Sequence, residues 1–207
     1  MDLSEQIAAV GRALEPGDGT HVVLLQQTFA AKAAELWSAF TDPARLERWL
    51  EPVEGDLREG GRYRLTGSGT EGTIERCVEP GALDVTWEFE GDVSRLSVAI
   101  VPSGGGTTVA LRHTVPDDDH WRAFGPAATG IGWDGAFLAL ALLLAGDPRS
   151  TPEAMGEFST SEPGLRFATE LARAWESAHL AAGADPEVAR DAAARAAAFY
   201  RGEEEPG

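Results

Sequence analysis

The chain has 207 residues, of which 17 are Lys or Arg and 34 are Asp or Glu, so its formal net charge is −17. Nucleic acids are held by clustered basic residues, and here the basic residues are outnumbered two to one, which excludes a nucleic-acid partner. Hydrophobic residues make up 43% of the chain. That proportion is enough for the core of one large domain and argues against intrinsic disorder.

Cys77 is the only cysteine, so the chain has neither an internal disulfide nor a zinc site made of thiolates. A reducing compartment, the cytoplasm, fits this usage. Residues 1–14 lack the basic start and apolar stretch of a signal peptide. The longest apolar run, residues 137–145, is far shorter than the roughly 20 residues of a membrane span. We therefore expect a cytoplasmic protein without a membrane span.

The N-terminal segment predicts one short helix followed by a linker over residues 1–20. Ser4 is a suitable N-cap, and a single apolar stripe follows before the breakers that start at Pro16. The stripe comprises Leu3, Ile7, Val10 and Leu14.

A strand and two helices are expected next. Residues 21–29 start with four consecutive apolar residues, which indicates a strand buried on both faces. Residues 30–40 have helical spacing. Asp42 can then cap a second short helix that begins at Pro43.

Residues 53–115 predict an antiparallel meander. The clearest strand is 83–90, where Leu83, Val85, Trp87 and Phe89 alternate with polar residues. Short Gly-rich connections separate this strand from similar runs, and connections this short join only antiparallel neighbours. Arg62 and Arg64 fall on the solvent-facing side of their strand.

Residues 126–145 predict a long helix with two apolar stripes, which must be covered on two sides. The second cover is supplied by an αα-hairpin over residues 147–202, with helices over 162–182 and from Asp185-Pro186 to Gly202. The alternative is that this hairpin forms the contact of a homodimer. Residues 203–207 are expected to be a disordered acidic tail.

Several segments of the chain resemble one known family. The segment from Ala31 to Pro43, followed by Leu46, Trp49 and Pro52, is similar to the opening signature of homologues of the heat-shock-protein-90 ATPase activator, within the START/SRPBCC superfamily. Further similar pieces are Gly60-Gly61, Gly72-Thr73-Ile74, Thr86-Trp87-Glu88, Gly106 to Val109 through His113, and Gly132-Trp133. The resemblance covers residues 21–145.

The resemblance implies the α+β helix-grip fold, in which a curved antiparallel sheet wraps a long C-terminal helix. Residues 21–146 would form this START-like domain, with the helical hairpin as an addition that the family pattern does not include. Such folds hold a cavity for apolar or aromatic small molecules between sheet and helix. The resemblance implies no reaction, because members include ligand carriers, cyclases and cochaperone domains.

Seven residues are candidates for ligand binding. Alternation places three aromatic residues and one histidine on the apolar sheet face, and the resemblance places three more aromatic residues on the helices opposite. Aromatic walls with few polar groups are typical of small-molecule pockets, whereas the same residues could also only fill a core. The candidates are Trp49, Tyr63, Trp87, Phe89, His113, Trp133 and Phe137.

His113 is the one candidate for catalysis. It shares a strand face with Val109, Leu111 and Val115. An imidazole there could orient a ligand carbonyl or act as acid or base. The alternative is a hydrogen-bonded histidine of the core or of the cavity rim.

Other motifs do not indicate a site. Residues 67–72 match GxGxxG, but a strand-like segment follows instead of the helix that a dinucleotide site needs, so they predict a hairpin turn. Residues 117–120, Asp-Asp-Asp-His, lack the spacing of a calcium loop and predict a helix cap. Asp84, Glu88 and Glu90 lie on the wet face of their strand. We expect no metal and no cofactor.

Three functions are compatible with these features. The first is binding of a hydrophobic, ring-containing or lipid-like small molecule in the sheet–helix cavity. The second is a cyclase- or hydrolase-like enzyme with His113 as acid or base. The third is a chaperone-regulating module, ranked last because only about 20 residues precede the first strand of the domain.

Overall fold

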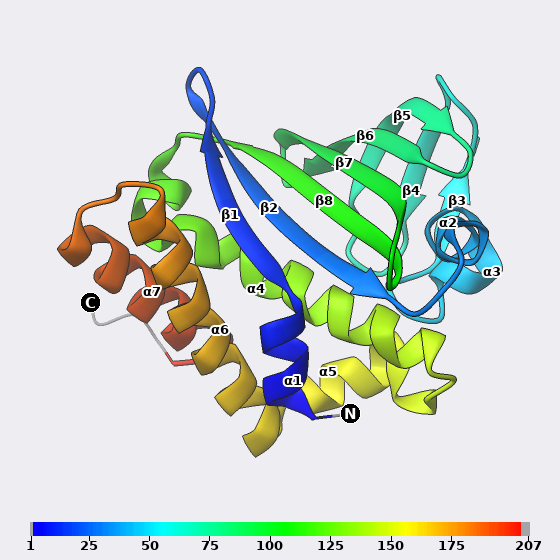
Figure 1. The fold of residues 1–207 in the computed structure, drawn as a ribbon. Coiled ribbons are helices and arrows are strands. Elements are labelled where there is room, and N and C mark those ends of the chain that lie inside the picture. The colour runs from blue at the N-terminus through cyan, green and yellow to red at the C-terminus, as the bar shows by residue number, and fades with distance from the viewer. Residues whose placement is uncertain (1, 204–207) are drawn as a thin grey trace.

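The computed structural model describes residues 2–203 and confirms the α+β helix-grip fold (Figure 1). One curved sheet of eight strands forms a layer, and the long helix α4 runs across one of its faces. Helices α2 and α3 lie at one end of the molecule, and α6 and α7 lie at the other.

The elements follow one another in a simple order. The helices are α1 (Leu3–Ala9), α2 (Ala33–Thr41), α3 (Pro43–Leu46), α4 (Asp119–Leu144), the 3₁₀ turn η1 (Pro148–Ser150), α5 (Pro152–Thr160), α6 (Glu162–Ala181) and α7 (Pro186–Tyr200). The strands are β1 (Gly11–Pro16), β2 (Thr20–Phe29), β3 (Val53–Gly55), β4 (Arg62–Leu65), β5 (Glu71–Val78), β6 (Ala82–Phe89), β7 (Asp92–Ser103) and β8 (Gly106–Pro116).

The N-terminal prediction was wrong in two respects. The first helix is capped by the side chain of Asp2, not Ser4, and ends at Ala9. Leu14 belongs to strand β1, which pairs antiparallel with β2 from Gly11 opposite Gln26 to Pro16 opposite His21. Residues 11–16 form a strand because β2 offers them backbone partners, and Pro16 is tolerated there because β1 is an edge strand.

The meander predicted for residues 53–115 is confirmed. Strands β3 to β8 pair antiparallel in sequence order, and β8 pairs with β2, which gives the order β1-β2-β8-β7-β6-β5-β4-β3. Residues 67–72 form the connection between β4 and β5 and the start of β5, as predicted for a hairpin. Along β8, buried and half-buried residues alternate, so Val109, Leu111 and His113 share the covered face.

The exposed face of the sheet carries paired charges. Arg62 donates to Glu88 and lies 3.3 Å from Glu71, and Arg76 lies 3.7 Å from Asp84. Two of the three carboxylates predicted for the wet face of the 83–90 strand, Asp84 and Glu88, therefore pair with arginines of β5 and β4, and Glu90 lies just beyond the end of β6.

The long helix begins earlier than residue 126. Asp118 caps it by accepting from the backbone N–H of Trp121, and the helix bends at Gly125, whose φ of 57° and ψ of −155° are not helical. Pro126 resumes the helix after this bend, since proline is favourable at a first helical position. The Asp-Asp-Asp-His segment is thus a helix start.

Helices α6 and α7 pack against α4 and against each other, and α6 also contacts β1. Helix α5, which lies in a segment without a predicted element, contacts α6. The tail predicted for residues 203–207 lies outside the described residues from position 204 onward.

Helix α4 is long and apolar enough to cross a membrane by length and composition, and 67% of its most apolar window is buried inside the protein. This composition follows from its position, because it is covered by the sheet on one side and by α6 and α7 on another. The helix is thus part of the core of an α+β domain.

Candidate functional site

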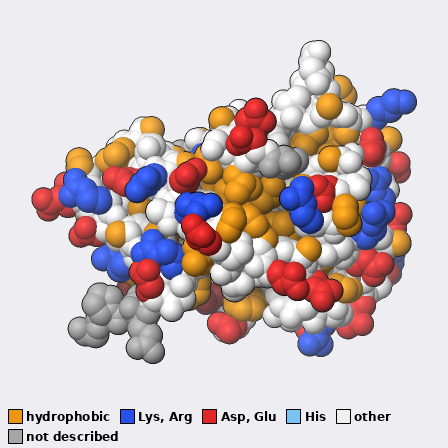
Figure 2. Space-filling model, turned by 90° about the horizontal axis from the view of Figure 1, so that it is seen from below, with side chains coloured by type: hydrophobic (Ala, Val, Ile, Leu, Met, Phe, Trp, Pro, Cys, Tyr) orange, Lys and Arg blue, Asp and Glu red, His pale blue; other side chains and the backbone are white. Residues whose placement is uncertain are grey.

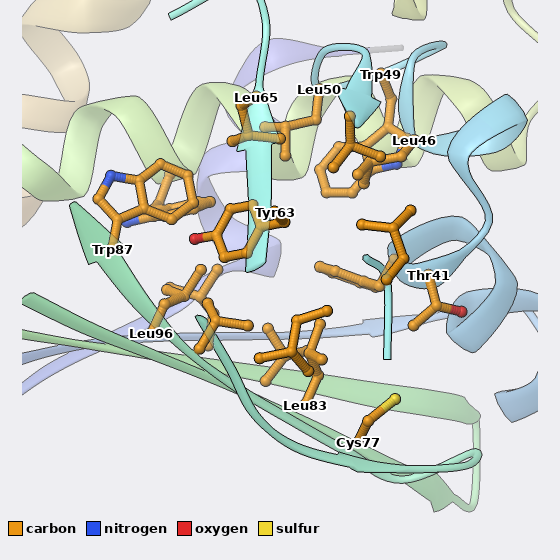
Figure 3. A pocket seen from close by; sticks show the side chains of 18 residues that line it. Thr41, Leu46, Trp49, Leu50, Tyr63, Leu65, Cys77, Leu83, Trp87 and Leu96 are labelled. Atoms are coloured by element: carbon orange, nitrogen blue, oxygen red, sulfur yellow. The ribbon is translucent and has the colours of Figure 1, made fainter. Parts of the chain in front are cut away.

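A cavity lies between the sheet and the helices α2, α3 and α4, and we name it the inner cavity (Figure 3). Its volume is about 110 Å³. Trp87 lies at one end, and Thr41 and Cys77 lie at the other. The lining residues are Phe40, Thr41, Leu46, Trp49, Leu50, Val53, Leu57, Tyr63, Leu65, Ile74, Cys77, Leu83, Val85, Trp87, Leu96, Val98, Leu111 and Trp133.

The sheet side of the inner cavity follows from strand alternation. Leu83, Val85 and Trp87 are every second residue of β6 and therefore face the same way. The loop and helix side is anchored by Trp49, which is 3% exposed and packs edge-on against Phe40 at a ring distance of 5.1 Å. Trp49 and Phe40 thus form a buried aromatic pair on the loop and helix side.

Most polar side chains of the lining are hydrogen-bonded within the protein. The indole N–H of Trp49 donates to a backbone carbonyl at 2.9 Å, and the hydroxyl groups of Tyr63 and Thr41 donate to backbone carbonyls at 2.7 and 2.8 Å. None of the described residues that line the inner cavity is Asp, Glu, Lys or Arg. Burial raises the pKa of the Tyr63 hydroxyl, so the group is neutral. The inner cavity therefore offers an apolar, uncharged surface.

Cys77 lies at the end of the inner cavity away from Trp87, half-buried. Burial raises the pKa of its thiol, and the carboxylates of Glu59 and Glu79 raise it further. The thiolate is the nucleophilic form of cysteine, so these neighbours make Cys77 a poor nucleophile.

His113 lies beside the inner cavity but does not line it. The indole N–H of Trp133 donates to His113 Nδ1 at 2.9 Å, and Ser94 Oγ lies 2.8 Å from Nε2. Because an indole nitrogen can only donate, Nδ1 is the acceptor and Nε2 carries the proton of the neutral ring. The Ser94 hydroxyl then donates to the backbone carbonyl of Trp87 at 3.2 Å.

Burial also fixes the charge of His113. The residue is 7% exposed, and loss of solvent lowers the pKa of its imidazole to about 4. The ring is thus neutral at pH 7, with both nitrogens hydrogen-bonded. The sequence left two alternatives for His113, an acid–base residue or a hydrogen-bonded histidine of the core or cavity rim. The burial and the two hydrogen bonds favour the second.

The seven predicted ligand-binding residues separate into two groups. Four line the inner cavity: Trp49, Tyr63, Trp87 and Trp133. The other three lie elsewhere. Phe137 is fully buried against Phe29 at a ring distance of 6.0 Å, and Phe89, at the end of β6, is 43% exposed. Phe89 and His113 line a depression of about 300 Å³ that adjoins the inner cavity at Trp87.

Sequence reasoning did not single out the aliphatic lining. Leu83 and Val85 could have been found, because they share the β6 face of Trp87. Leu50, Val53 and Leu57 follow helix α3 in irregular chain or short strand, where no periodicity indicates which way a side chain points. Nothing in the local pattern distinguishes them from surface residues.

Comparisons with known proteins agree with this architecture. The family model described as "Activator of Hsp90 ATPase homolog 1-like protein" matches residues 30–145. The crystal structure of CalU16 from Micromonospora echinospora is similar, with 31% identity, a TM-score of 0.65, and coverage of 82% of this chain and 95% of that one. Its solution structure gives 30% identity and a TM-score of 0.67, covering 85% and 95%.

A more distant structure shares the fold alone. Protein MLL2253 from Mesorhizobium loti is 22% identical, with a TM-score of 0.54, and covers 60% of this chain and 97% of that one. No curated protein matches the chain. The match over residues 30–145 and the likeness to CalU16 show that the chain belongs to the Activator of Hsp90 ATPase homolog 1-like family, with its START-like fold.

Proposed function

We propose that this protein binds an uncharged hydrophobic small molecule, with an aromatic ring or a branched aliphatic end seated in the inner cavity. The observation that carries the proposal is the chemistry of the lining: among the described residues it is apolar and without charged side chains, and the indole N–H groups of Trp49 and Trp133 and the hydroxyls of Tyr63 and Thr41 donate to partners within the protein. Binding of an apolar guest to such a surface is favourable because apolar area of both partners is removed from water. A charged guest would lose its hydration and find no partner there.

The size of the inner cavity supports one ring rather than a large molecule. Apolar cavities of about 150 Å³ take up benzene in other proteins, whereas sites for drug-sized ligands measure roughly 300–1,000 Å³. At about 110 Å³, this cavity suits a small ring or the end of a longer molecule. Trp87 and Trp133, whose rings meet edge-on at 5.3 Å, form the aromatic end.

Toluene, an uncharged single ring, tests the proposal in a ligand-observed NMR titration. Leu83→Trp places a large side chain on the lining face of β6 and should weaken toluene binding by at least about ten-fold. Val101→Trp is the matched control, because Val101 is 56% exposed on β7. Absence of toluene binding to the unaltered protein, or equal binding to both variants, would overturn the proposal.

Family membership supports a ligand-binding or cyclase-like role, and the second alternative, acid–base catalysis by His113, stays a prediction. The hydrogen bonds to both ring nitrogens and the lowered pKa favour a structural role instead. Chaperone regulation, pairing of two copies through the C-terminal helices, and location in the cytoplasm also stay predictions. A cytoplasmic location is compatible with the one cysteine of the chain, Cys77, which is free, because disulfides are rare in reducing compartments.

A further inference from the structure

A second hollow lies on the side of α4 away from the sheet, between α4, α5 and α6, and we name it the outer groove. Its volume is about 320 Å³. Seen from below, the molecule shows hydrophobic side chains gathered near the centre of this face, with charged side chains around them (Figure 2). The described residues that line the outer groove are Trp49, Leu50, Ile131, Gly132, Gly135, Ala136, Ala139, Pro152, Met155, Phe158, Ser159, Gly164, Phe167, Ala168, Leu171 and Tyr200.

Apart from Ile131, the α4 residues that line the outer groove are small. Gly132, Gly135, Ala136 and Ala139 face it, so the helix backbone itself forms the surface there. A Cβ atom added at Gly135 would meet no atom within 4 Å among the described residues. No packing contact therefore explains this glycine, although a glycine inside a helix destabilises it relative to alanine. The position gives room for a guest.

The inner cavity and the outer groove share two residues, Trp49 and Leu50. Trp49 is fixed by its hydrogen bond and its buried ring. Leu50 is half-buried in the irregular chain after α3 and has no such anchor on its side chain. Of the two residues that separate the spaces, Leu50 is the one that is less buried and whose side chain no hydrogen bond holds.

We propose that the outer groove is a second compartment of the ligand site, joined to the inner cavity when the Leu50 side chain rotates aside. This inference rests on the proposed function. The ligand is then an elongated, uncharged apolar molecule, with one end in the inner cavity and the rest along the glycine face of α4. Together the two spaces fall within the volume range of drug-sized ligands, which the inner cavity alone does not reach.

The chemistry of the outer groove agrees with such a ligand. No Asp, Glu, Lys or Arg is among its described lining residues. The Tyr200 hydroxyl donates to the carbonyl of Ala128 at 3.0 Å, and the Ser159 hydroxyl donates to the carbonyl of Gly156 at 2.7 Å. Most of the groove's far side comes from α5 and α6, which lie beyond residues 30–145 matched by the family model. The proposal therefore gives this C-terminal segment a part in ligand binding.

N-phenyl-1-naphthylamine tests the proposal, because it is uncharged, elongated and brighter in apolar surroundings. Gly135→Phe places a ring in the outer groove from a position where an added Cβ meets no described atom within 4 Å. It should weaken binding of this probe by at least about ten-fold, while toluene binding changes by less than about two-fold. Gly156→Phe is the matched control, since Gly156 is an exposed helical glycine of α5 with equally open surroundings that does not line the groove. Leu50→Ala shortens one of the two side chains that separate the inner cavity from the outer groove and should tighten binding of the probe.

The outcomes separate this inference from the proposed function. If Leu83→Trp abolishes binding of the naphthyl probe but Gly135→Phe leaves it unchanged, the inner cavity alone is the site and the second compartment is wrong. If Gly156→Phe weakens the probe as much as Gly135→Phe does, the effect does not come from the groove and the inference is also wrong. If neither toluene nor the probe responds to Leu83→Trp, the proposed function itself fails.

Discussion

Two glycines of helix α4, five positions apart, have opposite surroundings. A Cβ atom at Gly130 would lie 2.1 Å from the indole of Trp175, which is fully buried. A Cβ atom at Gly135 would meet nothing within 4 Å among the described residues. The first glycine is required by packing, and the second is not. The same helix thus belongs to a closely packed region on one side and to a hollow region on another.

The packed region is held by a buried polar network as well as by contact. Asp134, 1% exposed on α4, accepts two hydrogen bonds from the Arg12 guanidinium, at 2.7 and 3.0 Å, and one from Trp175 Nε1 at 2.8 Å. Arg12 also donates to two backbone carbonyls around the end of α1. This network ties β1, α4 and α6 together, whereas the polar groups around the inner cavity bond mainly to nearby backbone.

The largest effect is expected from breaking that network. Asp134→Asn keeps the size and an acceptor for Trp175 but leaves the Arg12 charge, 7% exposed, without its counter-charge. We expect a loss of about 3–5 kcal/mol in the free energy of unfolding, because an unpaired buried charge is costly. Urea denaturation at neutral pH measures the loss.

Two controls show that the loss comes from burial. Glu15 and Arg112 form a similar carboxylate–guanidinium pair on the surface, with side chains 48% and 41% exposed, and Glu15→Gln should cost far less. Adding Arg12→Met to Asp134→Asn removes the orphaned charge and should recover part of the stability. Equal losses for the buried and the exposed pair would contradict the contrast between the two regions.

The next effect concerns His113, which joins the sheet to α4 beside the inner cavity through its hydrogen bond with Trp133. Its folded pKa of about 4 lies below the ordinary value of 6.5. Between these values the unfolded chain binds a proton that the folded protein does not, so stability is lost as the pH falls from about 6.5 toward 4. The full shift corresponds to roughly 3 kcal/mol.

His113→Gln isolates this contribution. The glutamine amide oxygen can accept from Trp133 as Nδ1 does, but the side chain has no proton to gain. Comparing urea denaturation at about pH 7 and about pH 4.5, we expect the unaltered protein to lose roughly 2–3 kcal/mol more than the variant does. Parallel pH dependence in the two proteins would show that His113 is not held neutral by its surroundings.

Much of the fold could be predicted because local patterns dominate it. Alternation along 83–90 identified β6 and its apolar face. Asp42 with Pro43 identified the start of α3, where Asp42 accepts from the backbone N–H of Ala44. Strand β1 was missed because a short edge strand depends on its partner, and β2 lies beyond a turn at Gly19. The helical spacing of Leu3, Ile7, Val10 and Leu14 therefore did not decide the structure of residues 11–16, because pairing with β2 did.

The candidate site was predictable only in part. Trp87 and Phe137 both read as apolar residues facing the sheet–helix interior, yet Trp87 lines the inner cavity and Phe137 packs solid against Phe29. The difference depends on the local distance between sheet and helix, which alternation does not encode. Asp134 likewise reads as an ordinary polar residue of a helix, because its partners Arg12 and Trp175 lie 122 and 41 positions away.

The smallest effect tests the two glycines directly. Gly130→Ala should destabilise the protein by about 1–3 kcal/mol, because the added methyl group overlaps the Trp175 ring and the surrounding core cannot shift freely. Gly135→Ala should instead stabilise it by about 0.5–1 kcal/mol, since alanine is the better helix former and nothing opposes its methyl group. Urea denaturation of both variants measures the change in the free energy of unfolding, which should be negative for Gly130→Ala and positive for Gly135→Ala. A loss of stability in Gly135→Ala would mean that this glycine is needed for packing after all, and the argument that it leaves room for a ligand would then have no basis.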